Sequence, residues 1–178
     1  MADEIAKRHE LAIVNCLLQF MNEELGTSYG PAEASEAPDA LARDADGNVV
    51  GIEVTCGYYD DRDAKDTWEM PRARADARRS SRETVVRPKV LGLVNPDAAL
   101  ISSAQDSVNR HCLRTYEINP TYLVVDLSHA SLTTTTDAPA VLGALRLPRR
   151  HSFQGVYVAL RVNFTRRLEF FGVTQSCV

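Results

Sequence analysis

Cysteine is scarce in this sequence, and its four residues lie far apart with no Cys-x-x-Cys pair among them. This spacing argues against a zinc ribbon and against a disulfide-stapled scaffold. No apolar run is long enough to cross a membrane, and the acidic start, Met-Ala-Asp-Glu, does not resemble a signal peptide. A glycine-rich phosphate-binding loop is also missing. We therefore expect a cytoplasmic protein that is not embedded in a membrane and does not use such a loop.

Positive charge is in short supply too, since 24 acidic residues outnumber 20 Lys and Arg and give a net charge of −4. The chain as a whole therefore does not attract nucleic acid, and any such contact needs a local basic patch. A helix predicted over residues 67–86 carries five arginines: Arg72, Arg74, Arg78, Arg79 and Arg82. Arginine suits contacts with phosphate, so this patch predicts nucleic-acid binding. A solvated helix face, a flexible arm and a dimer contact are the alternatives.

Length and composition favour a single domain over residues 1–178, because a chain with 44% hydrophobic residues suffices for a core. The hydrophobic pattern changes between helical and strand spacing along the chain. Helices are predicted over residues 3–25, 98–116 and 138–147, and strands over 49–56, 89–94, 121–127, 153–162 and 167–173. This order predicts an α/β fold with a mixed central sheet flanked by helices.

The segment from Ser35 to Thr55 is predicted to be a β-hairpin, with Asp46-Gly47 at its turn. In the second strand Glu53 and Thr55 share one face, because successive side chains of a strand alternate. Folding the hairpin about its turn places Asp39 opposite Glu53 or one residue away. Two carboxylates so close repel each other, and a divalent cation relieves this because hard cations prefer oxygen ligands.

Pro38-Asp39, a hairpin and then Glu53-Val54-Thr55 resemble the motif of the PD-(D/E)XK nuclease superfamily, which has the restriction-endonuclease-like fold. The resemblance implies an αβββαβ core, to which the last two predicted strands add a C-terminal β-hairpin. It also implies that Asp39 and Glu53 hold Mg²⁺ or Mn²⁺. Thr55 stands where the family has a lysine that helps to activate water. Its hydroxyl or backbone can hold that water, but it brings no positive charge.

The resemblance extends to the first predicted helix, which in that family often contributes a glutamate to the metal site. Glu10 is the residue at the matching place, and it falls within the apolar arc of the helix. A buried carboxylate there needs a cation or a cavity, because an unpaired buried charge is costly. The alternative is that Glu10 lies at a frayed edge of the helix and pairs with Lys7, Arg8 or Arg114.

Some members of the family carry the lysine on a neighbouring helix, and His111 or Arg110 occupies about that place here. A histidine can accept a proton near neutral pH, although His111 can equally be a hydrogen-bonded core residue. The sequence thus predicts a metal-dependent nuclease with Asp39, Glu53, Thr55 and His111 as catalytic residues. The alternative is a catalytically degenerate member of the same fold that binds nucleic acid or protein. Many such nucleases act as dimers, so a homodimer stays open.

Overall fold

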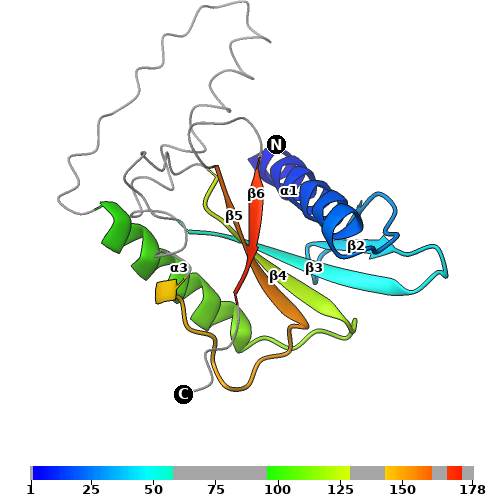
Figure 1. The fold of residues 1–178 in the computed structure, drawn as a ribbon. Helices are drawn as coiled ribbons and strands as arrows, with labels where there is room; N and C mark the ends of the chain where they lie inside the picture. The colour runs from blue at the N-terminus through cyan, green and yellow to red at the C-terminus, as the bar shows by residue number, and fades with distance from the viewer. Residues whose placement is uncertain (1, 58–95, 129–142, 162–167, 174–178) are drawn as a thin grey trace, which may run out of the picture.

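The computed structural model describes residues 2–57, 96–128, 143–161 and 168–173. Within them the chain forms two helices and six strands (Figure 1). The helices are α1 (Ala2–Glu24) and α3 (Pro96–Cys112). The strands are β1 (Glu33–Ala34), β2 (Ala40–Arg43), β3 (Val49–Cys56), β4 (Thr121–Asp126), β5 (Gly155–Leu160) and β6 (Glu169–Gly172). Neither helix is long and apolar enough to span a membrane.

All six strands join one mixed sheet in the order β1-β2-β3-β4-β5-β6. The three central strands β3, β4 and β5 run parallel, whereas the outer pairs β1–β2, β2–β3 and β5–β6 are antiparallel. The predicted hairpin is confirmed as β2 and β3. It turns at Gly47, which adopts a φ of +84° that suits glycine. The Asp44 carboxylate stabilises the turn by accepting hydrogen bonds from the N–H groups of Asp46 and Asn48.

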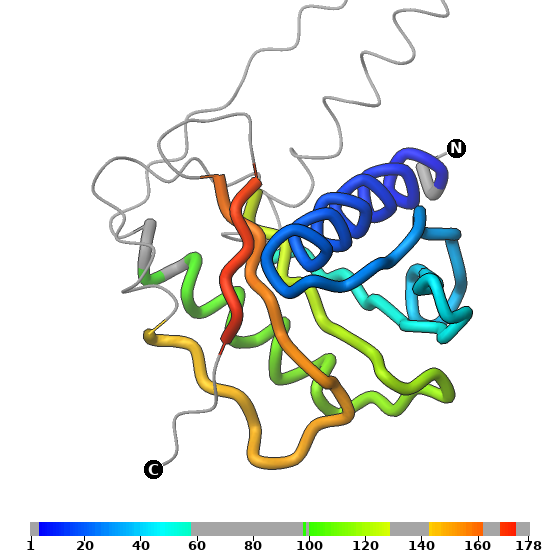
Figure 2. The backbone as a smooth tube through the Cα atoms, turned by 45° about the vertical axis from the view of Figure 1, so that its right-hand side comes forward, coloured from blue at the N-terminus to red at the C-terminus, as the bar shows by residue number. Residues whose placement is uncertain are grey.

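One helix covers each face of the sheet (Figures 1 and 2). The apolar stripe of α1 repeats at helical spacing through Val14, Leu17 and Met21, and it packs on the face formed by Ile52 and Val54 of β3. The other face packs against α3 through a second cluster: Leu100, Ala104 and Val108 of the helix with Leu123 and Val125 of β4. Because the side chains of a strand alternate, consecutive residues along β3, and likewise along β4, belong to opposite layers.

The α/β class and the mixed sheet flanked by helices are confirmed. The predicted helix over residues 98–116 ends earlier, at Cys112, and the next apolar residue, Leu113, is 83% exposed. One strand lies outside the predicted strands: β1 has only two residues, which are held by pairing with β2 and leave no periodic pattern in the sequence. The predicted strand over 89–94, the arginine-rich helix over 67–86 and the first half of the helix over 138–147, residues 138–142, lie outside the described residues.

Candidate functional site

The β2–β3 hairpin brings Asp39 beside Glu53, as the sequence predicts. Ala40 pairs with Ile52, so Asp39, one residue before Ala40, comes opposite Glu53, one residue after Ile52. A hydrogen bond fixes the arrangement: the Val54 N–H donates to Asp39 Oδ2 at 2.8 Å. We call Asp39 and Glu53 the carboxylate pair. Both acids lie on the face of the sheet that α3 covers.

The surroundings of the carboxylate pair disfavour two negative charges. Burial raises the pKa of Asp39, and hydrogen bonding from Val54 and the positive charges nearby offset this only in part. Burial also raises the pKa of Glu53, and the charge of Asp39 raises it further. Glu53 is 3% exposed, whereas Asp39 is half-buried. The pair therefore gains from a proton or a cation placed beside it.

The end of α3 supplies positive and polar groups to the carboxylate pair. Arg114 Nη1 lies 2.6 Å from Glu53 Oε1, and the Arg114 side chain is 56% exposed. His111 Nε2 lies 3.6 Å from the same oxygen, which is too long for a hydrogen bond. The Tyr116 hydroxyl is buried and has no well-formed hydrogen bond within the described residues. Burial and the charge of Glu53 raise the pKa of Tyr116 to about 12, so this group stays protonated.

His111 is held as a neutral ring with its basic nitrogen toward Glu53. Its Nδ1 lies 2.8 Å from the carbonyl oxygen of Ser107, and only an N–H can make this bond. Burial lowers the pKa of His111, and the charges of Arg114 and Arg110 lower it further, against the effect of the Ser107 carbonyl. In the neutral ring the lone pair is then on Nε2, which is the atom that faces the carboxylate pair. This geometry suits a proton acceptor.

Two further predicted residues lie near this group. Thr55 is buried and shares its sheet face with Glu53, two residues along β3. Arg110, the alternative to His111, reaches back along α3, where its Nη2 donates to the Ser107 hydroxyl at 3.3 Å. Of the two candidates on this helix, His111 is therefore the one whose side chain faces Glu53.

Glu10 is placed differently from the other predicted acids. It is half-buried on α1, which packs against the opposite face of the sheet from Glu53. Across the described ranges, one trio of potential metal ligands has its atoms within 4.8 Å of one another, and it consists of His9, Cys56 and Asp126. Glu10 and the carboxylate pair do not form such a trio. A role for Glu10 in metal binding stays a prediction.

The five arginines predicted to contact nucleic acid (Arg72, Arg74, Arg78, Arg79 and Arg82) lie outside the described residues. The sequence indicates Arg114 only as a partner for Glu10 and assigns no role to Tyr116, whereas in the structure both side chains act on Glu53. Arg114 follows His111 by three residues, which is the spacing of neighbouring side chains on a helix. This spacing was the sequence signal that could have placed Arg114 beside His111. Comparisons with protein-family models, with curated proteins and with solved structures gave no match to this chain.

Proposed function

We propose that this chain is a metal-dependent nuclease-like protein that hydrolyses phosphodiester bonds in nucleic acid at the carboxylate pair. One observation carries the proposal: two carboxylates share one sheet face, where burial raises the pKa of both and the charge of Asp39 raises that of Glu53 further. Mg²⁺ or Mn²⁺ relieves such repulsion through oxygen coordination. In this proposal the elements from α1 to β4 form a restriction-endonuclease-like core, and β5 with β6 is its C-terminal hairpin addition.

Asp39 and Glu53 would hold the metal ion, which supplies polarisation of the phosphate and a lower pKa for bound water. The Val54 N–H fixes the orientation of Asp39 through Oδ2. His111 Nε2 would accept the proton of the attacking water, the task that a lysine helps with in the resembled family. The exposed part of the Arg114 guanidinium would pair with a phosphate oxygen, because arginine can bind a carboxylate and a phosphate on different N–H groups.

The test is cleavage of single- and double-stranded DNA and RNA in the presence of Mg²⁺ or Mn²⁺. The isosteric variants Asp39→Asn and Glu53→Gln keep the side-chain shape but remove the charge, so we expect both to abolish cleavage. His111→Gln should lower kcat about 10²-fold or more, which is the usual contribution of a general base. A chelator should abolish cleavage by the wild type. Asp46→Asn, in the exposed hairpin turn, is the matched control and should cleave like the wild type.

A second candidate function follows from Arg114. Its guanidinium already lies 2.6 Å from Glu53 Oε1 and neutralises part of the charge that a metal ion would neutralise. If this ion pair replaces the metal, the chain is a degenerate relative of the fold that binds nucleic acid or protein without cleaving. Calorimetric titration with Mn²⁺ separates the candidates. Binding that is lost in Asp39→Asn supports the nuclease, whereas no binding and no cleavage by the wild type support the non-catalytic module.

A further inference from the structure

A second cluster of reactive side chains lies on the other face of the sheet, where the parallel strands β3 and β4 end. Cys56 and Asp126 are the last paired residues of these strands, so their side chains are neighbours at the carboxyl edge. His9 of α1 completes the cluster, with its Nε2 2.7 Å from Asp126 Oδ2. Cys56 Sγ lies 3.9 Å from the same oxygen, and the three ligand atoms are within 4.8 Å of one another.

Asp126 is positioned as a metal ligand would be. It is 1% exposed, and its Oδ1 accepts a hydrogen bond from the Ser128 N–H at 2.8 Å. Such a second contact orients a ligating carboxylate and leaves its other oxygen for the ion. Here that other oxygen, Oδ2, is the atom that faces both His9 and Cys56. A buried carboxylate, an imidazole and a thiol thus converge from three elements of the fold.

The spacing of these atoms is close to that of a tetrahedral zinc site. With bonds of about 2.0–2.1 Å to nitrogen, 2.0–2.2 Å to oxygen and 2.3 Å to sulfur, ligands at the tetrahedral angle stand roughly 3.4–3.6 Å apart. The His9–Asp126 separation of 2.7 Å would open by about 0.7 Å, and the Cys56–Asp126 separation of 3.9 Å would close by about 0.3 Å. His9 is 35% exposed at its side chain, so a small rotation of its ring is sterically open.

We propose that His9, Cys56 and Asp126 form a binding site for a zinc-class divalent ion, separate from the carboxylate pair. Thiolate and imidazole ligands favour Zn²⁺ over Mg²⁺, which prefers oxygen. Three protein ligands leave a fourth position for water or for another molecule, as in catalytic zinc sites. The alternative is that the cluster binds no metal ion. The His9–Asp126 hydrogen bond would then only hold α1 against β4.

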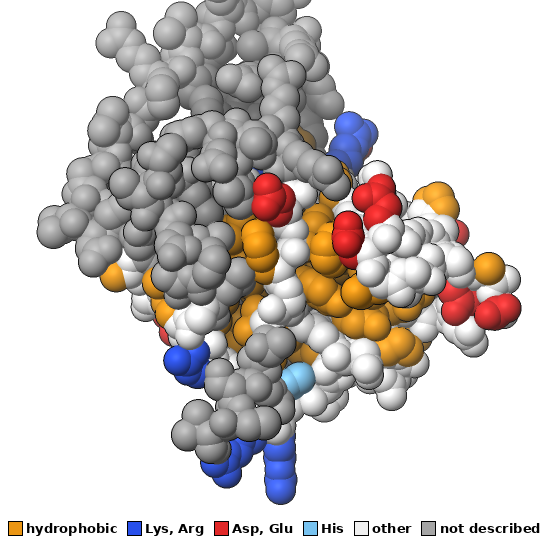
Figure 3. All heavy atoms as spheres, in the orientation of Figure 1, with side chains coloured by type: hydrophobic (Ala, Val, Ile, Leu, Met, Phe, Trp, Pro, Cys, Tyr) orange, Lys and Arg blue, Asp and Glu red, His pale blue; other side chains and the backbone are white. Residues whose placement is uncertain are grey.

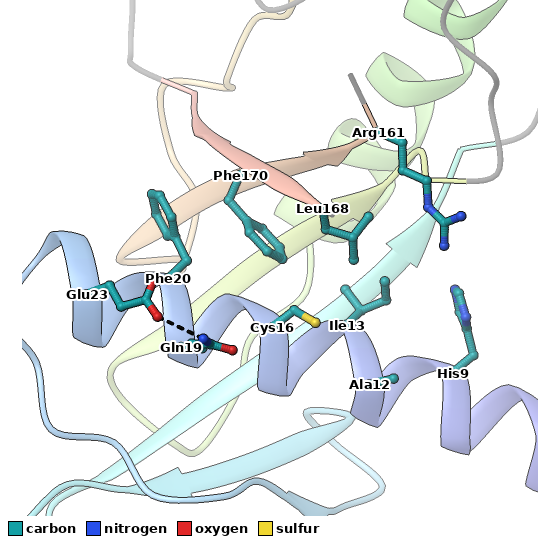
Figure 4. Close-up of a pocket in the computed structure, with 10 residues that line it drawn as sticks. All are labelled: His9, Ala12, Ile13, Cys16, Gln19, Phe20, Glu23, Arg161, Leu168 and Phe170. Atoms are coloured by element: carbon teal, nitrogen blue, oxygen red, sulfur yellow. Dashed lines mark hydrogen bonds between the residues drawn. The ribbon is translucent and has the colours of Figure 1, made fainter. Parts of the chain in front are cut away.

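A pocket of about 650 Å³ adjoins the site and has His9 in its wall. It lies between α1 and β6, which is an edge strand of the sheet, and Figure 3 shows hydrophobic side chains gathered there. In Figure 4 His9 and Arg161 point toward one another at one end, and Phe20 and Phe170 line the other. A molecule with an anionic end and an apolar body would thus place its charge at Arg161, beside the ligand His9.

Cobalt titration of the metal-free, tag-free protein tests the site, because tetrahedral Co²⁺ with a thiolate ligand gives intense visible bands and a sulfur-to-metal charge-transfer band. We expect one Co²⁺ to bind with a charge-transfer band, and Zn²⁺ to displace it. Cys56→Ser should remove the charge-transfer band, and His9→Gln should weaken Co²⁺ binding at least tenfold. Cys16→Ser is the matched control: this exposed cysteine lines the adjoining pocket outside the trio, so its loss should leave the spectrum unchanged.

Three results would overturn the proposal. They are no Co²⁺ or Zn²⁺ binding by the folded wild type, a charge-transfer band that survives Cys56→Ser, and a band that disappears in Cys16→Ser instead. Circular dichroism of each variant shows that it is folded before the titration is interpreted. Because Asp126 is buried, the substitutions are placed at the two less buried ligands. The test is independent of cleavage, so failure of the proposed nuclease activity does not affect its outcome.

Discussion

Among single residues, the buried carboxylate of Glu53 and the largely exposed guanidinium of Arg114 depend on one another. Arg114 Nη1 lies 2.6 Å from Glu53 Oε1, so the ion pair joins the centre of the sheet to the segment that follows α3. Glu53 has almost no contact with solvent, so water cannot replace the guanidinium if it is removed. Water can solvate the Arg114 guanidinium when Glu53 is removed. Glu53 therefore depends on Arg114 more than Arg114 depends on Glu53.

We predict that Arg114→Met lowers the free energy of unfolding by about 1–3 kcal/mol, less than the 3–5 kcal/mol typical of a fully buried pair. The discount follows from the exposure of Arg114, since water screens this charge. In a Glu53→Gln background the same substitution should cost less than half as much, because no buried charge is left unpaired. Urea unfolding of the four proteins at neutral pH measures both costs. Equal costs in the two backgrounds would contradict the coupling.

The carboxylate pair also predicts an unusual dependence of stability on pH. Because the pKa of Asp39 is raised in the folded protein, unfolding releases a proton above pH 3.8, the ordinary value for aspartate. The folded state therefore loses stability as the pH rises through this range. Asp39→Asn cannot titrate, so we expect it to become progressively more stable relative to the wild type as the pH increases, until Asp39 is fully ionised.

Urea midpoints measured at several pH values without divalent ions test this prediction, with Asp46→Asn in the exposed turn as the control. The slope of the difference against pH is the informative quantity, because it is unaffected by a constant loss of hydrogen bonding at Val54. A difference that stays constant or falls with rising pH would show that ionising Asp39 costs the fold nothing. Saturating Mn²⁺ should stabilise the wild type and leave Asp39→Asn unchanged if the pair holds the ion.

At the scale of elements, Gly51 sets how closely β3 approaches the segment that carries Asp39. A Cβ at this position would stand 2.6 Å from Pro38 Cγ and 2.9 Å from Thr121 Oγ1, and both distances are shorter than real contacts allow. The absence of a side chain therefore lets Pro38 pack over the strand and hold Asp39 beside Glu53. Gly51 is a positioning residue for the carboxylate pair.

We predict that Gly51→Ala destabilises the protein by about 1–3 kcal/mol, the usual cost of overpacking, and also weakens Mn²⁺ binding at the carboxylate pair. Gly143→Ala is the matched control, because a Cβ there meets nothing within 4 Å. That control should change stability by no more than about 0.5 kcal/mol. Thermal unfolding and calorimetric titration of the two variants measure both effects. Equal effects at Gly51 and Gly143 would show that Pro38 moves aside freely.

The elements also show what the sequence could predict. The alternation of β3 and the turn at Gly47 are local signals, and they were sufficient to place Asp39 opposite Glu53 or one residue away. The approach of Arg114 and Tyr116 to Glu53 depends on how α3 crosses from β3 to β4, which no local pattern states. Asp126 falls near the end of the predicted strand over residues 121–127, and no local pattern gives it a partner. Its neighbour Cys56 is 70 positions away, and only the parallel register of β3 with β4 brings them together.

At the scale of the whole molecule, the sheet separates two candidate metal centres of different chemistry. The carboxylate pair offers oxygen ligands on the α3 face, whereas His9, Cys56 and Asp126 offer nitrogen, sulfur and oxygen on the α1 face. Because β3 contributes to both, each ion would add rigidity to the same strand from opposite sides. If both centres bind ions, their ligand atoms predict selectivity for Mg²⁺ or Mn²⁺ at the carboxylate pair and for Zn²⁺ at the other centre.

The second centre joins α1, β3 and β4, so its occupancy should be visible in the stability of the whole fold. An ion that binds only the folded state at a free concentration of 100 times its Kd adds about 2.7 kcal/mol to the free energy of unfolding. For a chain of this length that corresponds to an increase of roughly 5–10 °C in Tm.

We predict a Zn²⁺-dependent increase of this size in the wild type and in Cys16→Ser, and none in Cys56→Ser. Differential scanning calorimetry with and without Zn²⁺ measures it, and Asp39→Asn should respond like the wild type because its substitution lies on the other face. An equal increase in Cys56→Ser would place the stabilising ion elsewhere in the molecule.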